Sequence, residues 1–180
     1  MNFFEEPISS KTVFQGRIVS VRDDMARLQN GKEAHREVVE HPGGVAIVPL
    51  LQDNGVLMVR QYRYCMSEEL LEIPAGKLEY GEDPLECAIR ELSEETGCQA
   101  EKMIYFGPIY PSPGFSQEIL HIYLATGLVR GEMHLDEDEF LSVETIALEA
   151  LIAQIMAGAI KDAKTIIGLM KTKQFLEQLS

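Results

Sequence analysis

The sequence lacks tryptophan, contains only three cysteines and has no long apolar run among its 180 residues. No stretch approaches the roughly 18 consecutive apolar residues that a membrane-spanning helix requires, so we expect no membrane association. The cysteines, Cys65, Cys87 and Cys98, are odd in number, show no metal-binding spacing and follow no signal peptide. We therefore expect reduced thiols in a cytoplasmic protein, with core packing as their simplest role.

Positive charge is also scarce, since 16 lysines and arginines face 29 aspartates and glutamates, for a formal net charge of -13. This balance argues against nucleic acid as a partner, whereas a small phosphate-bearing ligand could bind through a metal ion and local arginines. A chain of 180 residues with 46% hydrophobic content can bury a large core. We expect one main domain, residues 43–180, with an N-terminal appendage, residues 1–42.

Alternating apolar residues and turn signals predict strands along most of the chain, followed by helices. The segments 13–28 and 33–41 flank Asn30-Gly31, a pair typical of hairpin turns, so residues 1–42 are predicted to form a β appendage. Further strands are predicted at 45–51, 56–61, 104–106, 119–125 and 140–143, and helices at 147–156 and 162–179. The predicted fold class is α/β (α+β), with a mixed sheet between helices.

One helix can be predicted with both of its ends. Asp83 and Pro84 supply an N-cap and a first-turn proline, and Gly97 can adopt the left-handed conformation that ends a helix. At about 100° per residue, an apolar face and a carboxylate face lie side by side on this helix. The predicted apolar face contains Leu85, Ala88, Ile89, Leu92 and Thr96. The predicted carboxylate face contains Glu91, Glu94 and Glu95.

The carboxylate face calls for a counter-ion, because like charges three and four residues apart on a helix repel one another. Oxygen ligands favour Mg²⁺, with Mn²⁺ as the alternative, over zinc. The simpler interpretation is a solvated acidic surface, which is what most acidic runs are. The upstream glycine pair, Arg90 and the preceding strand-like segment favour the metal. We expect Arg90 to orient a carboxylate, while Glu82 could be capping, structural or metal-linked.

The segment GKLEYGEDPLECAIRELSEETGC, from Gly76 to Cys98, resembles the Nudix box of pyrophosphate hydrolases, with Cys98 replacing the usual large aliphatic residue. PSPGFSQE resembles the ADP-ribose pyrophosphatase branch, because Pro113 follows Gly97 by sixteen residues. REVVEHPGGVAIVPL, RQYRY, EIPAGKLE, LDEDEF and DAKT extend the resemblance over nearly the whole chain. The resemblance implies a Nudix-type α/β/α sandwich with a mixed sheet.

The resemblance also implies an activity, a set of site residues and an assembly. It implies Mg²⁺-dependent hydrolysis of ADP-ribose or a related nucleoside diphosphate sugar to a nucleoside monophosphate and a sugar phosphate. The implied metal ligands are Glu91, Glu94, Glu95, the backbone carbonyl of Ala75, and Glu139. The implied catalytic base is Glu137, although Glu137 and Glu139 could exchange roles. The implied substrate-binding residues are Arg36, Arg63, Pro113 and Glu118, with Arg36 reaching the partner's site in a homodimer.

Three functions remain open from the sequence. The first is hydrolysis of ADP-ribose or a related nucleotide sugar. The second is a Nudix hydrolase of other preference, acting on other sugar nucleotides, dinucleotides or oxidised nucleotides. The third is a nucleotide-binding sensor that has lost catalysis, against which the intact Glu91, Glu94 and Glu95 argue.

Overall fold

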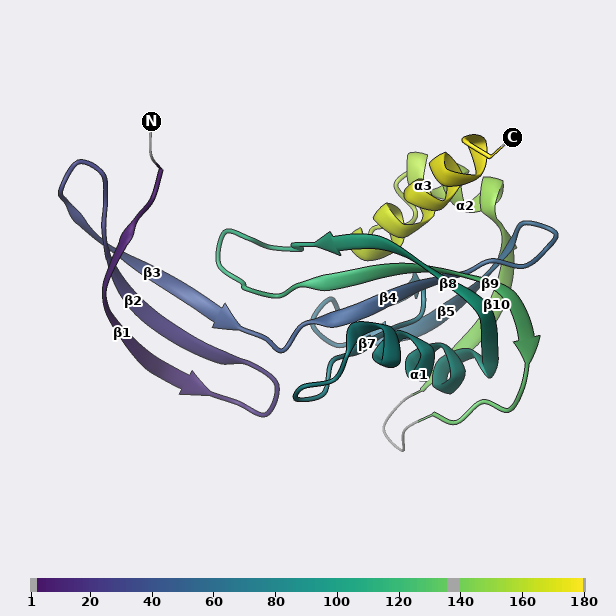
Figure 1. Ribbon diagram of the computed structural model, residues 1–180, viewed down its shortest axis with the longest axis horizontal. Coiled ribbons are helices and arrows are strands. Elements are labelled where there is room, and N and C mark those ends of the chain that lie inside the picture. Colours follow the sequence, from purple (N-terminus) through teal and green to yellow (C-terminus); the bar gives the residue numbers. More distant parts are fainter. Residues whose placement is uncertain (1–2, 136–139, 180) are drawn as a thin grey trace. The chain divides into compact units, whose positions relative to one another are not determined.

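The computed structural model describes residues 3–135 and 140–179. The chain divides into two compact units, one comprising Met1–Gly43 with Tyr110–Ile119 and the other comprising Gly44–Ile109 with Leu120–Ser180 (Figure 1). Within the described residues, no helix is long and apolar enough to cross a membrane. Cys87 and Cys98 are buried as predicted, whereas Cys65 is exposed, so the expectation of core packing was wrong for that residue.

The first unit contains an antiparallel three-stranded sheet, in the order β1 (Glu6–Gln15), β2 (Ser20–Arg27) and β3 (Glu33–Glu40). The predicted turn at Asn30-Gly31 is confirmed, although only Gly31 has a positive φ, of 79°. The single strand expected at 13–28 was wrong. A turn closed by the bond from Gly16 N–H to the Val19 carbonyl, at 2.9 Å, divides it, and β1 extends back to Glu6.

The loop 110–119 belongs to this first unit because it pairs with the end of β3. The Val39 amide donates to the Phe115 carbonyl at 2.7 Å, and the Gln117 amide donates to the Val39 carbonyl at 3.0 Å. These two bonds form a short parallel bridge between Val39 and Ser116. They hold the PSPGFSQE segment along the strand.

In its described residues, the second unit contains two sheets and three helices. The mixed four-stranded sheet has the order β7 (Ala75–Lys77), β4 (Gly44–Pro49), β9 (Leu120–Arg130) and β8 (Cys98–Ile109), with β4 and β9 parallel. The antiparallel three-stranded sheet has the order β10 (Leu141–Ala147), β5 (Gly55–Arg63) and β6 (Glu68–Glu72). The helices are α1 (Pro84–Thr96), α2 (Leu148–Met156) and α3 (Ala163–Glu177).

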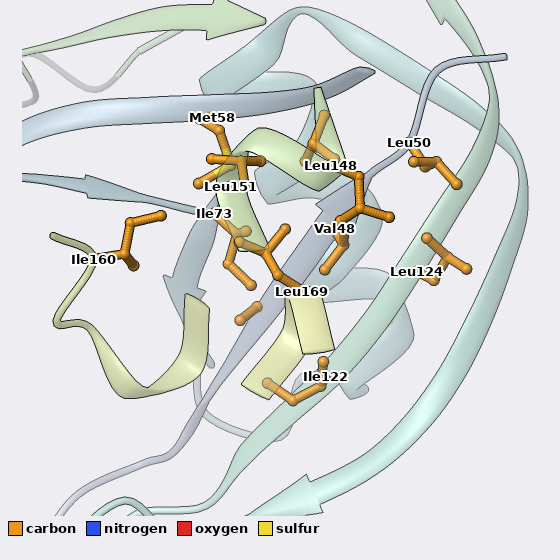
Figure 2. Close-up of a cluster of buried hydrophobic side chains, with 12 residues drawn as sticks. Val48, Leu50, Met58, Ile73, Ile122, Leu124, Leu148, Leu151, Ile160 and Leu169 are labelled. Carbon is orange, nitrogen blue, oxygen red and sulfur yellow. The ribbon is translucent and has the colours of Figure 1, made fainter. Parts of the chain in front are cut away.

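Strand β4 lies at the centre of this unit and is buried along its whole length. Ala46 and Val48 belong to a cluster that includes residues of α2 and α3. Figure 2 shows Val48 in this cluster. Val45 and Ile47, which alternate with them, face a second cluster that includes Cys87, Ala88 and Leu92 of α1. Helices therefore cover both faces, and the predicted α/β/α sandwich with a mixed sheet is confirmed.

The bounds predicted for the acidic helix are confirmed. Asp83 Oδ1 accepts a bond from the Leu85 amide at 2.8 Å, and Gly97 ends the helix with a φ of 68°. The predicted apolar face was partly wrong, because Leu85 and Ile89 are 40% and 48% exposed. The buried face is turned about the helix axis, and it contains Cys87, Ala88, Glu91, Leu92 and Glu95.

Candidate active site

Helix α1 carries two carboxylates into the protein interior. Glu91 is 7% exposed and Glu95 is 2% exposed, while the side chain of Glu94 is 34% exposed. All three lie on the arc predicted for the carboxylate face. Buried carboxylates are rare unless they are paired or bind a cation, so their partners define the site.

Strand β7 lies directly against the two buried carboxylates. A Cβ added at Gly76 would lie 1.8 Å from both Cδ and Oε1 of Glu91, so only glycine fits beside this side chain. One residue earlier, the Ala75 amide donates to Glu95 Oε2 at 3.0 Å. The backbone of β7 therefore forms one wall of the carboxylate site and fixes the orientation of Glu95.

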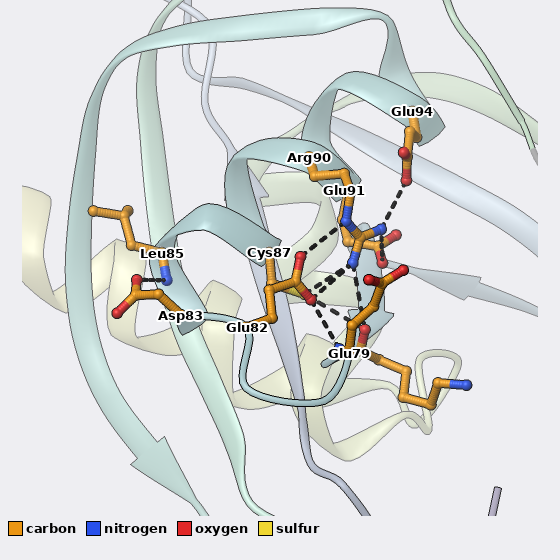
Figure 3. Close-up of polar contacts among 9 residues, drawn as sticks. Glu79, Glu82, Asp83, Leu85, Cys87, Arg90, Glu91 and Glu94 are labelled. Carbon is orange, nitrogen blue, oxygen red and sulfur yellow. Dashed lines mark hydrogen bonds and ion pairs between the residues drawn. The ribbon is translucent and has the colours of Figure 1, made fainter.

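Arg90 binds three carboxylates, as Figure 3 shows. Its Nη1 donates to Glu91 Oε1 at 2.7 Å and to Glu94 Oε2 at 2.9 Å. Its Nε and Nη2 donate to Glu82 at 3.0 and 3.2 Å. The hydrogen bond from Arg90 is the largest of the effects that lower the pKa of Glu82 to about 2, and the Glu79 amide bond acts in the same direction. Glu82 thus anchors Arg90. This contact answers the question of the role of Glu82, which the sequence had left open.

The donor set suits a hard divalent cation. The guanidinium of Arg90 pairs with three carboxylates, Glu82, Glu91 and Glu94, and Glu95 is bonded to the Ala75 amide. Four carboxylates and one guanidinium leave an excess of three negative charges. The side-chain ligands that these glutamates offer are all oxygens, and the absence of a side chain at Gly76 makes room for the Glu91 carboxylate. In residues 3–135 and 140–179, no three acidic, histidine or cysteine side chains already form a closed metal cage. Arg90 occupies the position between Glu91 and Glu94 instead.

The predicted substrate-binding arginines both hold carboxylates through two bonds. Arg63, in β5, donates from Nε and Nη2 to Glu72 at 2.8 and 2.7 Å. Arg36, in β3 of the first unit, donates in the same way to Glu5 at 2.8 and 2.7 Å. Each guanidinium therefore already presents the fork geometry that binds carboxylates and phosphates.

The other predicted residues are distributed between the first unit and the part of the chain that is not described. Pro113 and Glu118 lie in the loop that pairs with β3, and Glu118 Oε1 is 3.6 Å from Nδ1 of His41. Glu137 and Glu139 fall outside the described residues. The second unit brings together Ala75, Arg90 and the three helix glutamates listed here: Glu91, Glu94 and Glu95.

A buried charged group three residues before β7 was not predicted from the sequence. Glu72 is 1% exposed and pairs with both Arg63 and Lys164, and the next residue, Ile73, donates its amide to Thr165. A signal was present, because Glu72 interrupts the apolar run LLEIPAG. A charge within such a run is usually buried with a partner.

The fold and the carboxylate site together define a hydrolase of the class that uses a divalent cation at an acidic helix. Comparison with family models agrees with this class. The NUDIX domain model matches residues 40–167, and the model of the nucleoside diphosphate sugar hydrolase N-terminal domain matches residues 5–39. The chain therefore belongs to the Nudix hydrolase family, whose members generally use divalent metal cations.

Two relatives and one solved structure illustrate the similarity. A methanol dehydrogenase activator from Bacillus methanolicus is 43% identical over 169 residues, which cover 93% of this chain and 91% of that protein. An ADP-ribose pyrophosphatase from Bacillus subtilis (strain 168) is 40% identical over 163 residues, covering 89% and 88%. The crystal structure of an ADP compounds hydrolase has a TM-score of 0.87 at 22% identity, covering 98% of this chain and 96% of that one, and supports the fold.

Proposed function

We propose that the protein hydrolyses the pyrophosphate bond of ADP-ribose or a related nucleoside diphosphate sugar, giving a nucleoside monophosphate and a sugar phosphate. The observation that carries this proposal is the pair of buried carboxylates, Glu91 and Glu95, held between Gly76 and the Ala75 amide. The 40% identity to an ADP-ribose pyrophosphatase over most of the chain supports the choice of substrate class.

The cation that we propose is Mg²⁺, which Mn²⁺ can replace. Its proposed ligands are Glu91, Glu94, Glu95, Glu139 and the Ala75 carbonyl. When bound, such a cation polarises phosphate oxygens and lowers the pKa of a water molecule. The chain itself orients the ligands, because Arg90 fixes Glu91 and Glu94 while the Ala75 amide fixes Glu95. Oriented ligands are worth a large part of metal affinity in proteins.

The proposed general base is Glu137, with Glu139 as an added metal ligand. The three glutamates of α1 are proposed as metal ligands, so another group must accept the proton of the attacking water. Glu137 lies in the acidic segment that follows β9 in the sequence. Glu137 and Glu139 can exchange these two roles, and a pair of glutamine variants tells them apart.

Substrate recognition is assigned to Arg36, Arg63, Pro113 and Glu118. The Arg36–Glu5 pair is exposed, and exposed ion pairs contribute little to stability, so a substrate oxyanion can take the place of Glu5 at little cost. Arg63 is 40% exposed at its side chain and keeps an accessible edge while it holds Glu72. A rigid proline loop would place Glu118 for contact with a ribose hydroxyl.

The proposed assembly is a cytoplasmic homodimer in which residues 1–42 act as a dimerisation element and residues 43–180 as the hydrolase domain. The first unit supports this proposal through β1, whose residues are all exposed and include Ile8, Val13 and Phe14. A large exposed apolar surface on a strand commonly marks a protein interface. Sedimentation of the purified protein tests the dimer, and a fully active monomer would remove Arg36 from the site.

A substrate panel tests the proposed reaction. We expect Mg²⁺-dependent conversion of ADP-ribose to AMP and ribose 5-phosphate, with slower conversion of GDP-mannose, UDP-glucose or dinucleotides and none in EDTA. The products are separated by chromatography, and Glu95→Gln protein purified in parallel controls for contaminating activity. Preference for a dinucleotide or an oxidised nucleotide would make the protein a Nudix hydrolase of another specificity. Metal-independent binding without turnover would make it a nucleotide sensor.

A further inference from the structure

Thr165, in the first turn of α3, forms a hydrogen bond to the backbone of a distant segment. Its side chain is completely buried, and its Oγ1 accepts a bond from the Ile73 amide at 3.0 Å. The same hydroxyl donates to Oδ2 of Asp162, the residue that caps α3. Because the single hydroxyl proton goes to Asp162, the oxygen is oriented to accept from Ile73.

A second connection joins α3 to the residue just before Ile73. Glu72 accepts two bonds from Arg63 and also pairs with Lys164, which contacts Asp162 at 3.0 Å. Burial raises the pKa of Glu72, but the bonds from Arg63 and the charge of Lys164 outweigh it, so the pKa is lowered overall and the carboxylate stays ionised. Two neighbouring residues are thus tied to the start of α3.

Close packing strengthens the same contact one turn further along α3. A Cβ added at Gly168 would lie 2.9 Å from Cδ1 of Ile73 and 3.0 Å from Cγ2 of Val48. Helix α3 therefore approaches Ile73 as closely as its backbone allows. The side chain of Ile73 is fully buried among Leu151, Leu169 and the other members of this core cluster (Figure 2).

The segment that α3 holds leads directly to the carboxylate site. Pro74 follows Ile73, and its ring fixes φ of its own residue and restricts the residue before it. The Pro74 carbonyl accepts from the Ile47 amide at 2.8 Å. The next two residues, Ala75 and Gly76, are those that contact Glu95 and Glu91. A displacement of Ile73 would therefore be transmitted through a stiff backbone to both buried carboxylates.

We propose that Thr165, together with the ion pairs of Glu72, positions the Glu72–Gly76 segment so that β7 presents Ala75 and Gly76 to the metal-binding carboxylates of α1. Thr165 touches neither metal nor substrate and acts through Ile73, so it is a positioning residue. The inference rests on the proposed metal-dependent function. It assigns a role in the site to the DAKT segment at the start of α3, 92 positions along the chain from Ile73.

The chain offers a matched pair of buried threonines for the test. Thr165 and Thr172 are both completely buried in α3, but the Thr172 hydroxyl donates to the Gly168 carbonyl of its own helix at 2.9 Å. Replacing either with valine removes one buried hydroxyl and keeps the volume. Only Thr165→Val removes the link to Ile73, and Thr165→Ser keeps that link.

Mn²⁺ binding is measured by electron paramagnetic resonance in the absence of substrate. The values of kcat and KM and the melting temperature are measured on the same proteins. Groups that orient metal ligands typically change affinity by about 10- to 100-fold, so we expect Thr165→Val to bind Mn²⁺ about tenfold more weakly. We expect kcat at a limiting metal concentration to fall with it and KM for the nucleotide to change little. Thr165→Ser and Thr172→Val are expected to bind Mn²⁺ as the wild type does.

Wild-type Mn²⁺ affinity in folded Thr165→Val protein would overturn the inference, as would an equal loss of affinity in Thr172→Val. If the wild-type protein itself neither binds Mn²⁺ nor turns over substrate, the proposed function fails and the inference with it. Should Thr165→Val not fold, Lys164→Gln is compared with Lys161→Gln by the same readout. Lys161 pairs at 3.0 Å with Glu68, at the far end of β6 from Glu72. Only the Lys164 variant should therefore weaken Mn²⁺ binding.

Discussion

Replacing Gly76 with alanine tests the contact between β7 and the carboxylate helix. The new Cβ would lie 1.8 Å from Oε1 and 2.3 Å from Oε2 of Glu91, and real Cβ atoms essentially never approach another atom within 3.0 Å. The φ of Gly76 lies outside the left-handed region, and the residue pairs with Val45 in the sheet, so the backbone itself accepts alanine. Any loss of stability must therefore come from the displaced carboxylate.

The size of the effect follows from what Glu91 loses. At a compatible backbone position, glycine to alanine stabilises a protein by about 0.4–1 kcal/mol. Displacing Glu91 breaks its 2.7 Å bond to Arg90, and breaking a buried pair costs about 3–5 kcal/mol. Arg90 is 32% exposed at its side chain and keeps Glu82 and Glu94. We therefore expect the free energy of unfolding to fall by about 2 kcal/mol, below the range for a fully buried pair.

Urea unfolding of four proteins measures this effect: wild type, Gly76→Ala, Glu91→Ala and the double variant. In the Glu91→Ala background the colliding side chain is gone, so the added methyl should be neutral or slightly stabilising, with a coupling energy of about 2 kcal/mol. Gly114→Ala, with nothing within 4 Å of the added Cβ, controls for the backbone effect. An equal cost of Gly76→Ala with and without Glu91 would refute the steric reasoning.

Three further predictions concern the acidic residues. Glu95→Gln should abolish turnover while circular dichroism stays unchanged, because glutamine can still accept from the Ala75 amide; retained turnover would exclude Glu95 as an essential ligand. Glu137→Gln should lower kcat by about 10²- to 10⁴-fold with a smaller change in KM, and unchanged kcat would exclude it as the base. The pKa of Glu82 is lowered from 4.5 to about 2 in the folded protein, so it lies below the value in the unfolded chain. Ionised Glu82 therefore stabilises the folded state fully above pH 4.5, and this stabilisation is lost as the pH falls toward 2. Arg90→Met should weaken this dependence in urea unfolding between pH 6 and pH 3, and an unchanged profile would contradict the assigned cause.

Helix α1 and the hairpin between β2 and β3 could be predicted from the sequence because their signals are local. An N-cap aspartate, a proline in the first turn and a terminal glycine act within a few residues of themselves, and the predicted limits at Pro84 and Gly97 match the structure. The turn at Gly31 is of the same kind. Such features depend on backbone preferences that neighbouring elements rarely override.

Features that depend on distant packing could not be predicted. Strands β6 and β7 have only five and three residues, too few for a periodic pattern, so the segment before the acidic helix was described as strand-like without predicted bounds. Periodicity gave the relative angles of residues on α1 but not which arc is covered, so Leu85 and Ile89 were wrongly placed in the core. The Lys164–Glu72 pair joins residues 92 positions apart, and only the folded sheet brings them together.

The arrangement around Arg90 also bears on how the carboxylates of α1 are accommodated. Burying like charges is costly, and a fold selected for stability alone would place apolar residues at these positions. Arg90 reduces the cost, but two of its three nitrogens, Nε and Nη2, are held by Glu82, so Glu91 and Glu94 share Nη1 alone. Glu82 therefore keeps the guanidinium in place, and the guanidinium orients one oxygen of Glu91 and one oxygen of Glu94. A local violation of stability rules that is supported in this way is the mark of a functional site.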